Sequence, residues 1–460
     1  MRRISLLLPL TLSGCFMIGP DYQHPDIDTP NAWRFAPAET AAAGTEQWWK
    51  QFGDPQLTQL IEQALQHNKD LQVATASVEE YLGLYRVTRA DLFPQINGAA
   101  AGQQQQLSSA TFGARETPVF DSIQAALNLS WEIDVWGRLR RSTEAARANL
   151  YAKEEVRHAV ILTLVSSVAK SYVQLLELDQ RLEIAKQALL DRKEALRIVK
   201  ARFDNELNSE AQVRQAESEV YNAAALVPSL EKLVAQKEHE LSVLLGHNPA
   251  PIKRGLPLTG LHPPVIPAGL PSDLLTRRPD IRQAEQNLIA ANANIGAAVG
   301  QYFPKFTITG TFGSASADFS HLLSGPSGLW SYGLGLAMPL FTAGKIAGQV
   351  KAAEAREQQA LFGYQNTLLQ AFRETEDALV ENTKTQEQVQ ALTQQVVALR
   401  EYLKLAWLRY DNGLTSYLEV LDAQRNLLNV EISLVSTRSN ALQAMINIYK
   451  AFGGGWAVSS

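Results

Sequence analysis

The sequence predicts a duplicated chain in which very long coiled-coil helices are combined with a small number of membrane-spanning β-strands. Three observations lead to this fold class. Residues 137–203 contain no proline and, after Gly137, no glycine, and apolar residues recur among them every seven positions. The unit that contains this segment occurs twice. Two further segments alternate between apolar and small or polar residues over about eleven positions, a length that crosses a bilayer when the strand is tilted.

The long segment has the heptad pattern of a helix that winds against other helices. One apolar column consists of Val168, Leu175, Leu182, Leu189, Leu196 and Phe203. A second column, three residues further on, consists of Leu178, Ala185 and Val199, with Arg192 as its one polar member. At 1.5 Å per residue, such a helix would be about 100 Å long. A helix of this length is more than a globular core requires, so it is expected to span a distance.

The duplication is visible at the ends of the two long segments. Residues 202–209 read RFDNELNS and residues 409–416 read RYDNGLTS, and Gly137 matches Gly344 at the same offset of 207. The second copy has its own apolar column: Val389, Leu392, Val396, Leu399, Leu403, Ala406 and Tyr410. A tandem repeat therefore accounts for most of the chain. We expect repeats at 53–248 and 273–452, a proline-rich linker at 249–272 and a C-terminal tail at 453–460.

The N-terminus has the features of a lipoprotein signal peptide, expected at residues 1–14. Two arginines precede a short apolar run that cannot span a bilayer. The sequence LSGC at residues 12–15 resembles a lipobox, which predicts a covalent lipid on Cys15, the only cysteine in the chain. In the lipoproteins that this motif resembles, an aspartate after the cysteine favours retention in the inner membrane. Phe16 follows here, so the resemblance implies the outer membrane. The alternative is an ordinary secretory signal with a chance cysteine. An irregular anchor segment is expected at 15–52.

Within each repeat, helices flank the expected strands. Asp54 and Pro55 have the character of an N-cap and a first helical residue, and this helix is expected to run to about Leu92. Its counterpart in the second repeat is expected to begin at Pro279. After the long segments the chain is expected to turn at 204–209 and at 411–416. Each turn is expected to lead into a returning helix.

The expected strands lie at about 95–105 and 123–134, and at about 305–313 and 330–341. In the segments 123–134 and 330–341, apolar residues alternate with small or polar ones, which indicates strands with one apolar face. The other two segments are expected as their upstream hairpin partners. A soluble β-sandwich would have a similar alternation and is the alternative. Four strands cannot close a barrel in lipid, where each unpaired backbone group costs several kcal/mol. If the strands face lipid, several chains must therefore contribute strands to one barrel.

Composition and motifs make several classes of function improbable. The net charge of −5 gives no basic footprint for nucleic acid. No internal run approaches the 18 apolar residues of a membrane helix. The chain has no HExxH motif, no phosphate-binding loop and no GxSxG nucleophile elbow. The sequence therefore predicts neither an enzyme nor a metal or cofactor site, apart from the lipid on Cys15.

Four motifs resemble those of a known family, the outer-membrane factor lipoproteins of tripartite efflux systems, OprM/CusC-like members of the TolC superfamily. The motifs are WWKQFGDPQL at 48–57, NKDL at 68–71, RRPDIRQAE at 277–285 and YLEVLDAQR at 417–425. The resemblance covers essentially the whole mature chain. It implies a mixed fold with an all-α tunnel and a transmembrane β-barrel. A homotrimer would supply four strands per chain to a twelve-stranded barrel, and long coiled-coil helices would extend into the periplasm.

The resemblance also implies a function and partners. The chain would be a passive, gated exit duct in the outer membrane of a Gram-negative bacterium, working with a periplasmic adaptor (membrane fusion protein) and an inner-membrane RND-type transporter. Its cargo is left open among drugs, metal ions and solvents. Two alternatives are an exit duct for proteins, as in type I secretion, and a lipid-anchored coiled-coil spacer that conducts nothing. Single-channel conductance separates the spacer from both ducts.

The resemblance places two kinds of functional site at the ends of the long helices. The turns would contact the adaptor, through Asn205, Leu207, Ser209, Asn412, Gly413, Leu414 and Ser416. A plain helix–helix turn is the alternative, and Gly413 is expected to have a positive φ angle.

The periplasmic gate would follow the second turn. Leu418 and Asp422 share one helical face, and the resemblance puts the constriction there, together with Glu419 and Tyr410. The first repeat has Ala211 and Gln215 at the positions that match Leu418 and Asp422. A trimer would therefore form one leucine ring and one carboxylate ring, which favours cations. The alternative is ordinary packing for Leu418 and a solvated Asp422.

Overall fold

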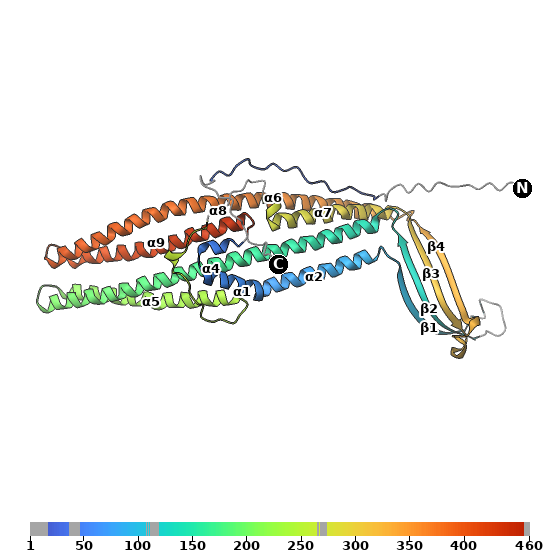
Figure 1. Ribbon diagram of the computed structural model, residues 1–460, viewed down its shortest axis with the longest axis horizontal. Helices are drawn as coiled ribbons and strands as arrows, with labels where there is room; N and C mark the ends of the chain where they lie inside the picture. The colour runs from blue at the N-terminus through green and yellow to red at the C-terminus, as the bar shows by residue number, and fades with distance from the viewer. Residues whose placement is uncertain are drawn as a thin grey trace. The chain divides into compact units, whose positions relative to one another are not determined.

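The computed structural model describes residues 17–35, 47–106, 108, 110, 119–264, 266 and 274–454 (Figure 1). Cys15 lies outside these residues. The chain divides into two compact units. The first combines Met1–Asp26, Ser77–Glu154 and Gln283–Gln365, and the second combines Ile27–Ala76, Glu155–Arg282 and Asn366–Ser460. Both units take segments from both repeats, so compact units and sequence repeats do not coincide.

The long helices have identical lengths in the two repeats. Helices α4 (Arg138–Asp204) and α8 (Lys345–Asp411) each contain 67 residues. The returning helices α5 (Glu210–Leu244) and α9 (Tyr417–Ala451) each contain 35 residues. The first and last residues of α8 and α9 each lie 207 positions after those of α4 and α5. This is the offset found in the sequence, so the duplication is confirmed. Figure 1 shows each pair, α4 with α5 and α8 with α9, as a helical hairpin.

The predicted apolar columns are buried to different extents. Every member of the column in α8 is buried or half-buried. In α4, Val168 and Leu175 are completely buried, whereas Phe203 at the end of the same column is 40% exposed. The second column of α4, including Arg192, is buried throughout. A straight α-helix drifts by about 20° per heptad, so a strict seven-residue column turns away from its partner over this length.

The helix expected to run from Pro55 to Leu92 is in fact two helices, α1 (Pro55–His67) and α2 (Lys69–Ala90). Asn68 separates them with an extended ψ angle of 132°. Its Oδ1 accepts a hydrogen bond from the Leu71 amide at 3.0 Å, and its Nδ2 donates to the Leu244 carbonyl oxygen at 3.0 Å. The tertiary contact with Leu244 could not be read from local sequence. The predicted cap is confirmed, because Asp54 Oδ1 accepts from the Gln56 amide at 2.8 Å.

The core of the second unit lies where α4, α5 and α9 meet the short helix η1 (Trp48–Phe52) and α1. The Trp48 and Tyr449 rings stack with their centroids 5.2 Å apart. The buried Asp54 carboxylate accepts hydrogen bonds from the Tyr172 hydroxyl at 2.8 Å and the Leu256 amide at 3.0 Å. These bonds satisfy a buried charge and fasten the proline-rich linker to α1.

Helix α4 is the one helix in the described part of the chain that is long and apolar enough to cross a membrane by length and composition. This differs from the expectation that no internal run would approach that limit. Two-thirds of the apolar window, 67%, is buried within the structure, and residues such as Val165 and Val168 belong to the core just described. The apolar stretch is therefore accounted for by packing.

The first unit contains one antiparallel sheet in the order β1-β2-β3-β4. The strands are β1 (Gln95–Gln106), β2 (Val119–Ile133), β3 (Lys305–Ser316) and β4 (Gly328–Ala337). Strands β2 and β3 extend beyond the predicted 123 and 313, whereas β4 stops before the predicted 341. Pro339 follows Ala337 by two residues and cannot donate a ladder hydrogen bond. The helices α6 (Leu274–Arg277) and α7 (Pro279–Val299) precede β3.

The register of the sheet places apolar residues on one face and small or polar residues on the other. Leu127, Phe312 and Trp330 are in register across β2, β3 and β4. Phe312 is 71% exposed and Trp330 is 72% exposed. The opposite face has Asn128, Thr311 and Ser331 in register. A soluble sandwich would bury its apolar face against a second sheet, so the sandwich alternative is wrong for the described sheet.

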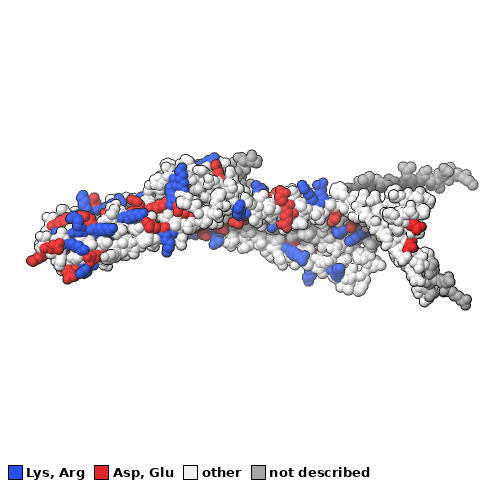
Figure 2. Space-filling model, turned by 90° about the horizontal axis from the view of Figure 1, so that it is seen from below, with Lys and Arg blue, Asp and Glu red and all other residues white. Residues whose placement is uncertain are grey.

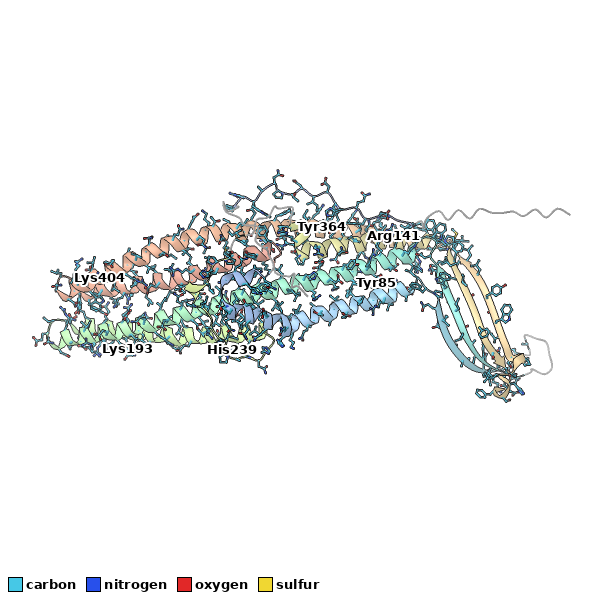
Figure 3. All side chains as sticks on the ribbon, in the orientation of Figure 1. Tyr85, Arg141, Lys193, His239, Tyr364 and Lys404 are labelled. Carbon is cyan, nitrogen blue, oxygen red and sulfur yellow. The ribbon has the colours of Figure 1, made fainter. Side chains whose placement is uncertain are left out.

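The N-terminal segment lies against the first unit from Met17 to Asp26. The buried Arg141 side chain donates to the Ile18 carbonyl oxygen at 3.3 Å and pairs with the Asp21 carboxylate at 2.6 Å. The backbone of Gly19 (φ 99°) lies so close to Gly296 that a Cβ atom would be 2.4 Å from the Gly296 Cα. Figure 3 labels Arg141, which lies in the first turn of α4.

Candidate functional site

The two hairpin turns end their first helices in the same way. In the first turn the Glu206 amide donates to the Phe203 carbonyl oxygen and the Leu207 amide donates to that of Arg202, both at 2.8 Å. In the second turn Gly413 and Leu414 make the equivalent bonds, at 3.0 and 2.8 Å. This is the Schellman arrangement, in which one residue has a positive φ angle.

The positive φ angle predicted for Gly413 is confirmed, at 72°. The matching residue in the first repeat, Glu206, has a φ angle of 63° despite its side chain. Asn205 and Asn412 each donate from Nδ2 to the carbonyl oxygen four residues earlier, at 2.7 Å. The first turn therefore adopts the same shape as the second without a glycine, and the same hydrogen bonds hold both turns.

Each turn presents an exposed leucine. Leu207 is 67% exposed and Leu414 is 71% exposed, although the residue at this position of a Schellman motif frequently packs against its own helix. Ser209 and Ser416 occupy the N-caps of α5 and α9. Figure 2 shows Lys, Arg, Asp and Glu side chains of both signs gathered over the hairpins, whereas the strands are mostly uncharged on the face shown.

Tyr410 lies in an aromatic cluster that only the second repeat contains. Its ring lies 5.9 Å from that of Trp407 and 5.8 Å from that of Tyr417, between centroids. Two residues of the first repeat also contact it. Asn208 Nδ2 donates to the Tyr410 hydroxyl at 2.8 Å, and the Arg202 guanidinium lies 4.6 Å from the ring centroid. Tyr410 therefore ties the second hairpin to the first turn.

The structure brings together two of the predicted gate residues and separates a third. Leu418 is 58% exposed and Asp422 is also exposed, on the same face of α9. Glu419 instead pairs with Arg409 at 3.1 Å and accepts a hydrogen bond from the Thr415 hydroxyl. Glu419 therefore stabilises the second turn within its own hairpin. Asp422 accepts a hydrogen bond from Asn426 Nδ2 at 3.0 Å on its own helix.

A charge cluster that the sequence analysis did not assign to the gate joins the two hairpins. Glu219 on α5 is 4% exposed and pairs with the equally buried Arg192 of α4 at 3.3 Å. It also pairs with Arg425 of α9, which is half exposed. The available signal was Arg192, the one polar member of an apolar column. Its partners are distant in sequence, so the pattern alone could not identify them.

The environment of this cluster shifts two pKa values in opposite directions. Burial lowers the pKa of the Arg192 guanidinium, although Glu219 opposes the shift. The hydrogen bond to Glu219 raises the pKa of Arg425, and the nearby Asp422 adds to this. Both arginines remain charged at neutral pH. The two cations therefore share one buried carboxylate within the described part of the chain.

In the described part of the chain, no group of three or more histidine, cysteine, aspartate or glutamate residues is arranged to hold a metal ion.

Comparison with known proteins assigns the chain to a family. Residues 60–247 and 270–454 match the family described as outer membrane efflux protein. The chain is 37% identical over 454 residues to the probable efflux pump outer membrane protein TtgC of Pseudomonas putida, with 97% of this chain and 93% of that protein covered. It is 32% identical over 464 residues to the probable outer membrane lipoprotein SilC of Salmonella typhimurium, with 99% of each covered.

Solved structures of outer-membrane channels have the same fold. The OprN channel superposes with a TM-score of 0.90 at 30% identity, covering 95% of this chain and 99% of that chain. The open state of the MtrE channel of Neisseria gonorrhoeae superposes with a TM-score of 0.87 at 30% identity, covering 96% and 99%. The family consists of channels and not of enzymes. The chain belongs to the outer membrane efflux protein family, with the TolC-like fold of an α-helical tunnel and a β-domain, and is an outer-membrane exit duct of an efflux system.

Proposed function

We propose that three copies of this chain combine their strands into one closed twelve-stranded barrel and their helices into one tunnel. The observation that carries this proposal is the sheet. Its apolar face is exposed, and β1 and β4 are its free edges. Backbone groups at such edges cannot stay unpaired in lipid. Pairing β4 of one copy with β1 of the next satisfies both edges, and the resemblance to the family favours three copies.

The proposal is tested by asking whether the purified protein forms a trimer and whether that trimer conducts ions. Native mass spectrometry of the purified protein in detergent is expected to give three times the mass of the lipidated chain. Planar bilayers containing the same preparation are expected to show discrete conductance steps. A monomer in detergent, or a trimer that conducts nothing in any variant, would contradict the proposal. The second outcome would favour a non-conducting spacer.

The duct is passive in this proposal, and its partners supply energy and selection. An inner-membrane RND-type transporter would deliver cargo, and a periplasmic adaptor would contact the two hairpin turns. The exposed Leu207 and Leu414 favour such a contact, because apolar side chains anchor many protein interfaces. The relatives are named for toluene, for solvents and for antibiotics. Small organic molecules are therefore the cargo that we propose.

The gate lies at Leu418 and Asp422, near the second turn. In a trimer these exposed side chains would form an apolar ring and an acidic ring around the axis. Three carboxylates placed so close together repel one another. The contact of Tyr410 with Asn208 and the ion pair of Arg425 with Glu219 join the second hairpin to the first and would hold α9 in place against this repulsion. Contact between the turns and the adaptor would open the gate by loosening those links.

The second turn is expected to be sensitive to bulk at Gly413. Gly413→Val forces a β-branched residue into the left-handed region and is expected to cost about 1–2 kcal/mol. The distorted turn should then cross-link less well to the adaptor and confer less drug resistance in cells. The control is Gly348→Val, because Gly348 has an ordinary φ angle and open space around it in α8. Wild-type cross-linking and resistance in Gly413→Val would exclude the second turn as an adaptor contact.

Cys15 is expected to carry the lipid in this proposal. Mass spectrometry of the mature N-terminus should find a diacylglyceryl adduct on Cys15, and Cys15→Ser should abolish it. Efflux is expected to survive this substitution, because the barrel still anchors the trimer. A free thiol in protein purified from native membranes would refute lipidation.

A further inference from the structure

A cavity of about 420 Å³ lies within the second unit, among α4, α8, the end of α9 and the start of α7. This volume is in the range of small-molecule sites. Part of its wall is apolar, contributed by Ala159, Leu162, Pro279 and Ala378, and the rest is charged or polar. The cavity could therefore hold an organic body together with polar groups.

The cavity lies on the side of α4 and α8 that faces away from η1, α1 and the N-terminal segment. Lys170 lines the cavity, and Val168 and Tyr172, each two residues away, belong to the core beneath η1 and α1. Two residues correspond to about 200° around a helix. On α8, Glu374 lines the cavity, and Phe372 and Glu376, each two residues away, contact Trp33 and Arg34 of the N-terminal segment. If the chain forms the proposed tunnel with η1, α1 and the N-terminal segment on its outer side, the cavity opens on the lumen of the tunnel.

One group of charged side chains in the cavity is already paired. Arg278 pairs with the Asp280 carboxylate at 2.6 Å and with the Glu374 carboxylate at 2.7 Å. It also donates to the Ala451 carbonyl oxygen at 3.1 Å. These contacts occupy three of the charged side chains that line the cavity. The remaining ones are two lysines and two carboxylates.

The two lysines form a cationic pole without a partner. Lys170 on α4 and Lys450 on α9 are both half-buried, and neither side chain forms an ion pair or a hydrogen bond within the described residues. Burial lowers the pKa of Lys170, and the charge of Lys450 lowers it further, while Glu381 opposes the shift. An anionic group placed between the two ammonium groups would remove this repulsion.

The other pole is acidic. The Asp377 carboxylate is 68% exposed and has only a long contact, 3.9 Å, with the equally exposed Arg373. Glu381 accepts a hydrogen bond from Asn447 Nδ2 at 3.2 Å. The cavity thus presents unpaired cations on α4 and α9 and an available carboxylate on α8. A ligand with one charge of each sign and an apolar body complements this arrangement.

We propose that this cavity is a transit site for small amphoteric organic molecules. A carboxylate of the ligand binds Lys170 and Lys450, its ammonium group binds Asp377, and its apolar body contacts Leu162 and Ala378. The inference rests on the proposed duct, whose cargo would move along this wall. It assigns a charge class to the cargo that neither the turns nor the gate determine.

The test uses three probes of similar size: 4-(aminomethyl)benzoate, benzoate and benzylamine. Calorimetry with the purified wild-type protein in detergent is expected to show the zwitterion binding about tenfold more tightly than either singly charged probe, since charge-assisted hydrogen bonds add at both ends. Lys170→Met with Lys450→Met should abolish this advantage and weaken benzoate. Asp377→Asn should weaken the zwitterion and benzylamine and leave benzoate unchanged.

Lys232→Met is the control, because Lys232 is an exposed lysine on α5 outside the cavity. Equal binding of the three probes to the wild-type protein, or unchanged binding in all pole variants, would overturn the site. Asp377→Asn alters an exposed residue, so the test does not depend on the lysine variants folding. Failure of the duct is a separate result. A protein that binds the zwitterion but does not conduct refutes the duct, and one that conducts without this preference refutes the site.

Discussion

Conductance is expected to rise several-fold, and the preference for cations to fall, when Leu418→Ala and Asp422→Ala are combined. Both side chains are exposed on one face of α9. In the proposed trimer, removing the leucines widens the constriction and removing the carboxylates eliminates its negative ring. The measurements are single-channel conductance and the reversal potential in a salt gradient.

The first repeat supplies a matched control for this experiment. Gln215 is the counterpart of Asp422, and the counterpart of Leu418 is already alanine. Gln215→Ala should leave conductance and ion preference unchanged. If the double variant forms an intact trimer with wild-type conductance and selectivity, the gate lies elsewhere. Leu418 would then be a packing residue and Asp422 a solvated one.

The largest effect on stability is expected from Glu219→Ala. The substitution leaves the buried Arg192 without its counter-charge and detaches Arg425 of α9 from α5. Breaking a buried ion pair from one side typically costs about 3–5 kcal/mol. The link between the hairpins should weaken accordingly. Chemical unfolding should show the lower free energy, and bilayer recordings should show more frequent opening.

Two comparison variants test whether the loss of the buried ion pair causes the lower stability and the more frequent opening. Glu217→Ala removes a half-buried carboxylate that pairs with the more exposed Lys200 and Arg214, and it should change stability little, because such pairs near the surface contribute little. Glu219→Met combined with Arg192→Met removes both buried charges and should recover most of the lost stability. Opening should remain frequent in the double variant, because Arg425 still lacks its partner. Wild-type unfolding and gating in Glu219→Ala would show that the cluster does not hold the hairpins together.

Much of the architecture could be predicted from the sequence because it depends on periodic patterns of neighbouring residues. The heptad columns, the alternating strands and the offset of 207 residues each depend on neighbours a few positions apart, or on direct self-comparison. The turns were also predictable. The pair RFDNELNS and RYDNGLTS marks both, and Gly413 has the positive φ angle that its residue type indicated.

One error occurred where a distant residue takes part in the local structure. The single helix expected from Pro55 to Leu92 is broken at Asn68, whose side chain binds the carbonyl oxygen of Leu244. This partner lies 176 residues away, outside the window in which a pattern can be recognised.

The sequence by itself determined the duplicated long helices, the spacing of the strands, the turns and the resemblance to the family. Those features follow from periodicity and from residue types that act within one or two helical turns. Only the tertiary structure decided that Glu219 joins Arg192 to Arg425, that Asn208 reaches Tyr410, and that Lys170 meets Lys450 in one cavity. Each of these arrangements brings together residues that are far apart in the sequence, and its energy depends on burial and distance, which no linear pattern records.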